Sequence, residues 1–159
     1  MKKEKVLILN DIRSVENVGA MFRTADAFGI DKIYLSGYTP TPLDRFGRNR
    51  NDFHKSALGA EEHVKWEYKK SLSIVLNKLK KEGHFFIGVE QVKDSVDFRK
   101  LKSILKNKNK YAFIMGNEVS GISKNVLKKC DLVVEIPMHG QKESLNVSVA
   151  CGIILFSSL

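Results

Sequence analysis

The chain has 159 residues, a length typical of one domain, and 43% of them are hydrophobic, which is enough to build a sizeable core. It carries 27 Lys and Arg against 18 Asp and Glu, and this net charge of +9 suits either a polyanionic partner or a well-solvated surface. The two cysteines, Cys130 and Cys151, lack zinc-ligand spacing and argue against a disulfide framework. We expect one domain over residues 1–159, with no metal.

The chain begins MKKEKVLILND, in which basic residues precede a short apolar run that meets Asn10 and Asp11. This run is too short for a secretory signal or a membrane span. The N-terminus therefore predicts a soluble, cytoplasmic protein that does not associate with a membrane.

Short apolar runs rich in β-branched residues recur along the chain, each followed by a polar or glycine-containing turn. They predict buried strands at Val6–Leu9, Lys32–Leu35, Phe85–Val89, Tyr111–Met115 and Leu132–Ile136. Helical patterns lie between them, at Val18–Phe28, Leu72–Lys81 behind Ser71, Lys124–Cys130 behind Ser123, and Leu145–Phe156. This alternation predicts an α/β fold with a mostly parallel sheet and helices on both faces.

The segment Asn17–Gly29 opens the first predicted helix. Gly19 and Arg23 are four residues apart and share a helical face, so the missing side chain at Gly19 predicts room for a ligand beside the guanidinium group. A solvated surface arginine is the alternative, because most charged helix residues are simply solvated.

A long surface loop is predicted between Gly37 and Asn51, where two prolines, Pro40 and Pro42, precede a basic run. Loops of this length are often functional, so its cations are candidates for substrate contact, together with a nearby lysine: Arg45, Arg48, Arg50 and Lys55. A second basic run, between Arg99 and Lys110, precedes the fourth predicted strand. It should lie at the amino end of the sheet, where a solvated face is the preferred interpretation.

The fourth predicted strand breaks into a loop that carries glycines at positions 116 and 121. Glycine at the carboxyl end of a parallel strand lets the backbone approach a small ligand closely, although the pattern alone predicts only a tight turn. The chain has neither a G-x-G-x-x-G fingerprint nor a Walker A loop.

The fifth predicted strand leads through a flexible loop into the last helix. Ser144 is predicted to cap that helix, and free amides near Leu145 and Asn146 would offer donors to an anion or a polar ligand edge. His139 is interpreted as a solvated loop residue, because no acidic or cysteine partner is evident.

These three segments together resemble the motifs of the SpoU (TrmH-like) RNA 2′-O-ribose methyltransferases of the SPOUT superfamily. Asn17–Ala25 is similar to motif 1, Gly116–Gly121 to motif 2, and Ile136–Met138 with Ser144–Ser148 to motif 3, in the order of the family. The resemblance implies a C-terminal trefoil knot, a homodimer, and a bent S-adenosylmethionine held by the knot loops.

The resemblance also implies an activity, namely methylation of a ribose 2′-hydroxyl in a structured tRNA or rRNA, with tRNA favoured. Arg23 would activate the hydroxyl, with Asn17, Glu118 and Asn146 orienting the reacting groups. The cofactor would be bound mostly through backbone groups at Val89, Gly116, Ile136, Met138, Ser144 and Leu145. We expect the RNA to be bound by the basic loop described above.

Arginine is almost always protonated, which leaves two roles open for Arg23. Either its pKa is perturbed in the assembled site, or it positions the hydroxyl and stabilises a developing alkoxide while another group accepts the proton. A non-catalytic RNA-binding module of the same fold is the alternative function, and a different α/β nucleotide-binding enzyme, for example an ATPase, is a second. Retention of Arg23, Glu118 and Asn146 argues against the first, and the absent phosphate loop against the second.

Overall fold

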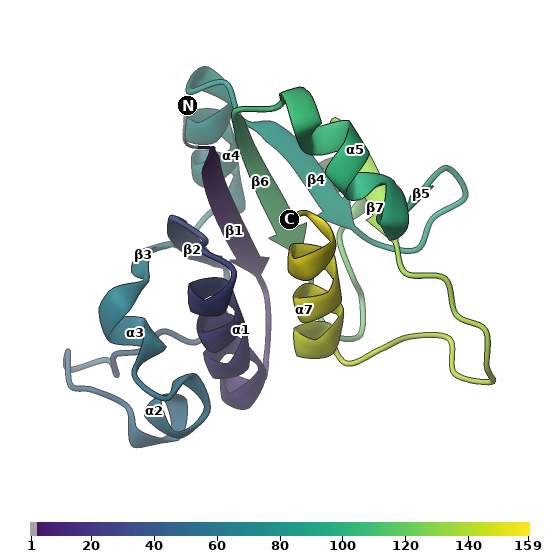
Figure 1. Cartoon of the computed structure of the whole chain (residues 1–159). Coiled ribbons are helices and arrows are strands. Elements are labelled where there is room, and N and C mark those ends of the chain that lie inside the picture. Colours follow the sequence, from purple (N-terminus) through teal and green to yellow (C-terminus); the bar gives the residue numbers. More distant parts are fainter. Residues whose placement is uncertain (1–2) are drawn as a thin grey trace.

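Seven parallel strands form a single sheet in the computed structural model of the chain, which describes residues 3–159 (Figure 1). Their order across the sheet is β3-β2-β1-β6-β4-β7-β5. The strands are β1 (Glu4–Asn10), β2 (Lys32–Ser36), β3 (Lys65–Lys69), β4 (Phe85–Val89), β5 (Val96–Asp97), β6 (Lys110–Met115) and β7 (Leu132–Glu135). All of the pairings between neighbours are parallel, as the alternating sequence pattern predicts.

Helices cover both faces of this sheet, so the predicted fold class is confirmed. They are α1 (Val15–Ala27), α2 (Asn51–Ala57), α3 (Ala60–His63), α4 (Leu72–Lys81), α5 (Leu101–Ile104), α6 (Lys124–Leu127) and α7 (Val147–Ser157), with 3-10 turns at Phe98–Lys100 and Leu105–Asn107. None of the helices in residues 3–159 is long and apolar enough to cross a bilayer.

Strand β1 shows how the two faces are filled. Its buried residues alternate, with Leu7 and Leu9 in the core under α1 and α7, and Val6 and Ile8 in the core under α4. Successive side chains of a strand point to opposite faces, so a continuous apolar run is what a strand covered on both sides requires.

Two strands are missing from the sequence prediction, and both lie at the edges of the sheet. Strand β3 reads Lys-Trp-Glu-Tyr-Lys, and its charged side chains form ion pairs, among them Glu67 with Lys32 of the neighbouring strand at 2.6 Å. Strand β5 is only two residues long. Hydrophobic periodicity identifies central strands, which are buried on both faces. An edge strand pairs with only one neighbour and can be charged or very short, so its sequence lacks a continuous apolar run.

Gly19 has a different role from the one expected. A Cβ atom there would lie 1.9 Å from Ser56 Oγ and 3.0 Å from the carbonyl oxygen of Phe53, both in α2. The absent side chain therefore allows α1 and α2 to pack closely, and the predicted space for a ligand beside Arg23 is filled by protein.

Candidate functional site

A cavity of about 590 Å³ lies at the carboxyl ends of β4, β6 and β7. A volume of this size is typical of small-molecule sites, and this edge of a parallel sheet is where such sites commonly occur. The residues expected to bind a cofactor all line it: Val89, Gly116, Ile136, Met138, Ser144 and Leu145. The tertiary structure thus brings together residues from three segments that are far apart in the sequence.

The wall that follows β6 is a tight loop built around two glycines. A Cβ atom at Gly116 would lie 2.6 Å from the backbone of Gly121, so the missing side chain serves the packing of the loop on itself. Gly121 has a φ of +66°, which favours glycine, and a Cβ there would lie 2.0 Å from Glu90 Oε2. Of the two interpretations of Gly116, close approach of a ligand and a tight turn, the packing of the loop on itself supports the turn.

Glu90 is a pocket residue that the sequence analysis missed. Its carboxylate accepts hydrogen bonds from the backbone amides of Ile122, at 2.9 Å, and Gln91, also at 2.9 Å. It therefore ties the end of β4 to the loop that follows β6. The sequence feature that could have identified Glu90 is its position as an acidic residue directly after a buried strand, at the edge of the sheet where ligands bind.

Asn117, also missed, holds the first turn of the same loop. Its side-chain amide donates to the carbonyl oxygen of Asp11 at 2.9 Å and to the hydroxyl of Tyr38 at 2.8 Å. Its side-chain oxygen accepts from the backbone amides of Val119 and Ser120. The loop after β6 is consequently fixed to the loops that follow β1 and β2.

The segment 137–145, of which Met138, Ser144 and Leu145 line the opposite wall of the cavity, has an unusual backbone. Within the described part of the chain, none of its amides or carbonyls forms a hydrogen bond. Backbone groups of this kind need partners when a ligand excludes water from them. This wall therefore offers both donors and acceptors to a polar ligand edge.

Three of the four predicted catalytic residues form one hydrogen-bonded network beside the cavity. Glu118 accepts from the backbone amides of Arg13 at 2.9 Å and Ser14 at 3.1 Å, and from the side-chain amide of Asn17 at 3.3 Å. The side-chain amide of Asn146 donates in turn to Asn17 Oδ1 at 3.1 Å. The network joins α1, the loop after β6 and the start of α7.

The pKa of Glu118 is lowered from its usual value of 4.5. Partial burial alone would raise this pKa, but the hydrogen bonds from the amides of Arg13 and Ser14, and from Asn17, outweigh it. Glu118 is therefore an ionised acceptor at neutral pH, and it fixes the start of α1.

Asn146, and not Ser144, caps the last helix. Its side-chain oxygen accepts from the backbone amide of Ser148 at 2.8 Å, and α7 begins at Val147, two residues later than predicted. Its amide nitrogen is then free to reach Asn17. One asparagine therefore sets both the start of α7 and its link to α1.

Arg23 stands apart from this network. It is exposed, does not line the cavity, and forms no hydrogen bond or ion pair with any residue in the range 3–159. It follows Asn17 by six helical residues, which is about 9 Å along the axis and roughly 120° around it. The structure therefore brings together Asn17, Glu118 and Asn146 but not Arg23.

The cations of the predicted basic loop fall into two groups. Arg48 Nε donates to Asp44 at 2.8 Å, and Arg50 forms two hydrogen bonds with Asp52, so these two charges have carboxylate partners. Arg45 lies 4.7 Å over the exposed ring of Phe46 and, like Lys55, is exposed, and neither has a carboxylate partner within residues 3–159. The loop follows the carboxyl end of β2, on the same side of the sheet as the cavity.

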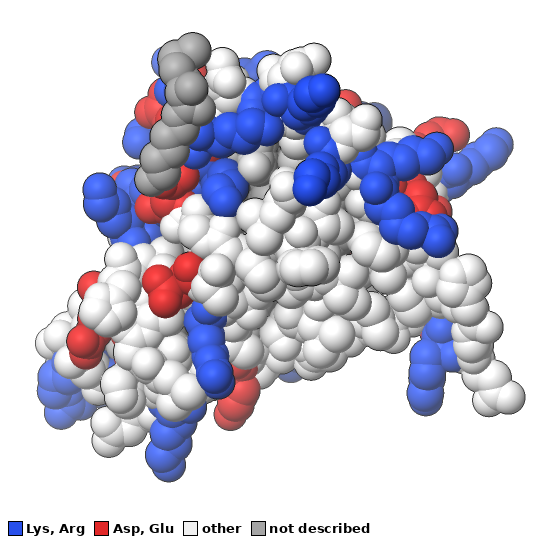
Figure 2. Space-filling view, viewed as in Figure 1, with Lys and Arg blue, Asp and Glu red and all other residues white. Residues whose placement is uncertain are grey.

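The second basic run does not lie wholly at the amino end of the sheet, as was expected. Asp97 is paired in register with Glu135, the last residue of β7, and Arg99 is bonded to Asp97, so the run begins near the carboxyl ends. Only its later part reaches the amino end, where Lys110 lies opposite Glu4. Figure 2 shows Lys and Arg gathered over α4 and α5, in the upper part of the view.

Comparison with known proteins assigns the chain to a family. Residues 4–156 match the model of the SpoU rRNA Methylase family. An uncharacterized tRNA/rRNA methyltransferase of Borreliella burgdorferi is 34% identical over 157 residues, which are 98% of this chain and 64% of that protein. The chain thus spans just under two thirds of the length of this relative.

Two solved structures share the fold over 99% of this chain. The TrmH/SpoU tRNA modifying enzyme of A. aeolicus has a TM-score of 0.82 at 27% identity, with 74% of that chain covered. The AdoMet-bound rRNA methyltransferase of Sinorhizobium meliloti has a TM-score of 0.86 with 56% covered, and at 24% identity its likeness concerns the fold alone. With its seven-stranded parallel sheet, the chain belongs to the SpoU rRNA Methylase family.

Proposed function

We propose that this protein transfers a methyl group from S-adenosylmethionine to a ribose 2′-hydroxyl of a tRNA or rRNA. The observation that carries the proposal is the position of the Glu118–Asn17–Asn146 network beside the cavity at the carboxyl ends of the strands. Membership of the family and the RNA-methylating relatives support the reaction class. Structured RNA, with tRNA favoured, is the proposed substrate.

The cavity suits the proposed cofactor in size and in chemistry. Its volume of about 590 Å³ fits a nucleoside joined to an amino acid, and the unpaired backbone groups of Met138, Ser144 and Leu145 match the donors and acceptors of an adenine edge. Apolar side chains, including Val89, Ile136 and Leu145, also line it. When bound, S-adenosylmethionine would supply the electrophilic methyl group on its sulfonium.

The protein's own residues would position the ribose. Asn17 donates to Glu118, and Asn146 donates to Asn17, so both amide groups are held in place beside the cavity. Such preorganised groups reduce the entropy lost in orienting a hydroxyl. We assign Arg23 to the hydroxyl because of its place in the first motif, and its fixed positive charge would stabilise the developing alkoxide. Since Arg23 lies outside the cavity of one copy of the chain, this contact requires bound RNA or a second copy to bring the hydroxyl and the guanidinium together. The unpaired Arg23 guanidinium is available for that contact.

A homodimer forms part of this proposal. The apolar helix α7 carries no charged residue, and Val149 and Phe156 are 50% and 66% exposed. With Ile153 they follow an i, i+4, i+7 spacing, so they lie along one face of the helix. Burial of this face against a second copy would remove it from water. Sedimentation should find a species of twice 18.0 kDa, and a monomer that remains active would exclude this arrangement.

The trefoil knot expected from the family motifs also stays a proposal. Its support is the path of the last helix, which returns from the loop at residues 136–146 and packs beside α1. A Cβ atom at Gly152 would lie 3.8 Å from Thr24 Cγ2, so the two helices are in close contact there. A crystal structure traced through this loop would test the threading.

The function is tested by replacing Arg23. Arg23→Ala should abolish single-turnover methylation of the native RNA while leaving S-adenosylmethionine affinity unchanged, because Arg23 does not line the cavity. Arg13→Ala is the matched control, since Arg13 is an exposed arginine whose backbone amide, not its side chain, contacts Glu118. Cofactor binding without methyl transfer by the parent protein would favour a non-catalytic RNA-binding module. Unchanged turnover in Arg23→Ala would remove Arg23 from the mechanism.

A further inference from the structure

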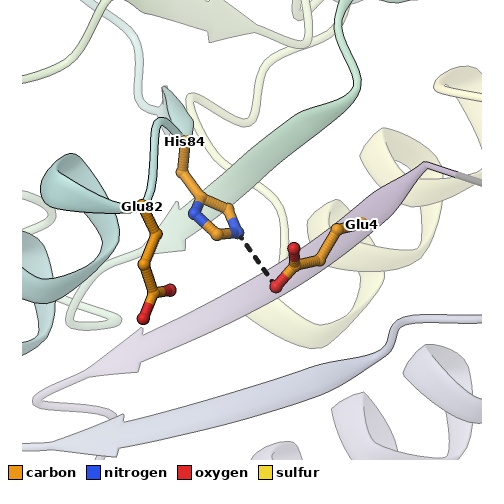
Figure 3. A group of neighbouring side chains, drawn as sticks. All are labelled: Glu4, Glu82 and His84. Carbon is orange, nitrogen blue, oxygen red and sulfur yellow. Dashed lines mark ion pairs between the residues drawn. The ribbon is translucent and has the colours of Figure 1, made fainter.

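A cluster of three side chains at the amino end of the sheet, opposite the cavity, has no part in the function proposed above. Glu4 begins β1, Glu82 follows the last residue of α4, and His84 directly precedes β4. Their candidate ligand atoms lie within 4.8 Å of one another. Figure 3 shows the imidazole ring of His84 between the two glutamate side chains, with its Nε2 atom directed at Glu4.

The sheet register explains why residues so distant in sequence meet. Glu4 pairs across β1 and β6 with Lys110, while Phe85 pairs across β4 and β6 with Tyr111. His84, one residue before Phe85, therefore lies on the other side of Lys110 from Glu4. This meeting depends on strand order and cannot be recognised from ligand spacing, which is why the sequence predicts no metal.

The two ring nitrogens of His84 have different surroundings. Its Nδ1 lies 3.2 Å from the carbonyl oxygen of Leu79, and because a carbonyl only accepts, Nδ1 must carry the proton. The other ring nitrogen, Nε2, is then the atom that can bind a cation. This nitrogen belongs to a side chain with no exposed surface, has no hydrogen-bond partner, and lies 3.5 Å from Glu4 Oε1. A buried nitrogen without a partner, facing a carboxylate oxygen, is an arrangement that a proton or a metal ion at Nε2 would stabilise.

The two carboxylates are each held on one side by a lysine. Lys110 Nζ lies 3.1 Å from Glu4 Oε2, which leaves Oε1 facing His84. Lys78 Nζ lies 3.4 Å from Glu82 Oε1. The glutamate side chains are 43% and 39% exposed, so an ion from solvent can reach the cluster.

We propose that Glu4, Glu82 and His84 bind a divalent cation of the zinc type, with water as a further ligand. One imidazole nitrogen and two carboxylate oxygens form a donor set that suits Zn²⁺, and a ligating histidine usually donates its other N–H to a carbonyl, as His84 does to Leu79. Metal–ligand bonds of about 2.0–2.2 Å require the ligand atoms to approach. Rotation of the solvent-exposed Glu82 side chain supplies that movement.

Such an ion would join the start of β1 to the turn between α4 and β4. Because it binds the folded chain, it would raise the melting temperature by roughly 5–10 °C at a concentration about a hundred times its Kd. The site lies at the end of the sheet away from the cavity, so chelation should leave S-adenosylmethionine affinity unchanged. The proposal therefore stands or fails independently of the proposed methyl transfer.

The test is calorimetric titration of metal-free protein with Zn²⁺, with Mg²⁺ as the comparison ion. We expect one zinc site, weakened at least tenfold by His84→Gln and by Glu82→Gln. The second variant alters an exposed side chain at a helix end and should fold normally. His54→Gln is the matched control, because His54 also faces a carboxylate, Glu61 at 2.7 Å, but on the exposed surface of α2.

Nitrogen NMR of the imidazole distinguishes a metal ion from a proton at Nε2. Zinc should shift the Nε2 resonance of His84 and leave Nδ1 protonated. Three results would overturn the proposal: no zinc bound at millimolar concentration, equal affinity in parent, His84→Gln and Glu82→Gln, or loss of the site in His54→Gln. A protonated Nε2 that is unaffected by zinc at neutral pH would likewise show that an ordinary histidine–glutamate ion pair occupies this place.

Discussion

The side-chain amide of Asn146 donates a hydrogen bond to Asn17 Oδ1 at 3.1 Å, across 129 residues of sequence. The same asparagine caps α7 through its side-chain oxygen, and Asn17 also donates to Glu118. The stability of the last helix and the arrangement of the proposed ribose site therefore depend on one side chain, and its two roles can be separated experimentally.

Asn146→Asp should separate them. Aspartate keeps the acceptor that caps α7, so the free energy of unfolding should change little, but it lacks the N–H that reaches Asn17, so methyl transfer should fall. Asn146→Ala should lose both, at a stability cost of about 1 kcal/mol. Urea unfolding and single-turnover kinetics measure the two effects. Equal activity in Asn146→Asp and the parent would show that the bond to Asn17 has no role in turnover.

Glu118 should make stability depend on pH in the acid range. Its folded-state pKa is lowered, so its stabilising contribution is fully present above the unfolded value of about 4.5 and is lost as pH falls through the folded pKa. Glu118→Gln should remove this contribution, so its difference from the parent in unfolding free energy should be constant above about pH 5 and should shrink below pH 4.5. Denaturation curves at several pH values test this. If the difference in unfolding free energy does not vary with pH, the ionised Glu118 carboxylate is not the source of the stabilisation.

Gly116 should tolerate no side chain, whereas Gly140 should. A Cβ at Gly116 would meet the backbone of Gly121 at 2.6 Å, so Gly116→Ala should displace the loop after β6 and weaken both stability and S-adenosylmethionine binding. Gly140→Ala is the matched control, since nothing lies within 4 Å of its Cβ position. Thermal unfolding and calorimetry compare the variants. If both alanine variants behave like the parent, the loop is more adaptable than its packing indicates.

The RNA path is best tested through the two cations of the basic loop that lack carboxylate partners. Replacing Arg45 and Lys55 together by alanine should flatten the slope of log K against log[salt] by roughly 1.5, at about 0.7–0.9 for each phosphate contact. Replacing Arg48 instead would leave the negative charge of Asp44 without its partner, so the measured salt dependence would include the effect of that carboxylate. Lys106 and Lys108 near the amino end form the comparison pair. A larger change in the comparison pair would move the RNA to the α4–α5 side of the molecule.

The sequence by itself determined the central strands and the main helices. The runs Val6–Leu9 and Tyr111–Met115 lie in β1 and β6, which are covered on both faces, and the expected helix at Leu72–Lys81 has the observed bounds. Burial of both faces demands a continuous apolar run, and such runs are visible without tertiary information. Five of the six residues expected to bind the cofactor belong to contiguous motifs, with Val89 the exception, and all six line the same cavity.

Only the tertiary structure decided the details that depend on one segment meeting another. It placed Ser56 against Gly19 and Gly121 against Gly116, two close approaches that no local pattern encodes. It also made Asn146, and not Ser144, the cap of α7, and it brought the side-chain amide of the same residue to Asn17. The meeting of Glu4 with His84 follows from the order β1-β6-β4, which is a property of the folded sheet and not of any window of sequence.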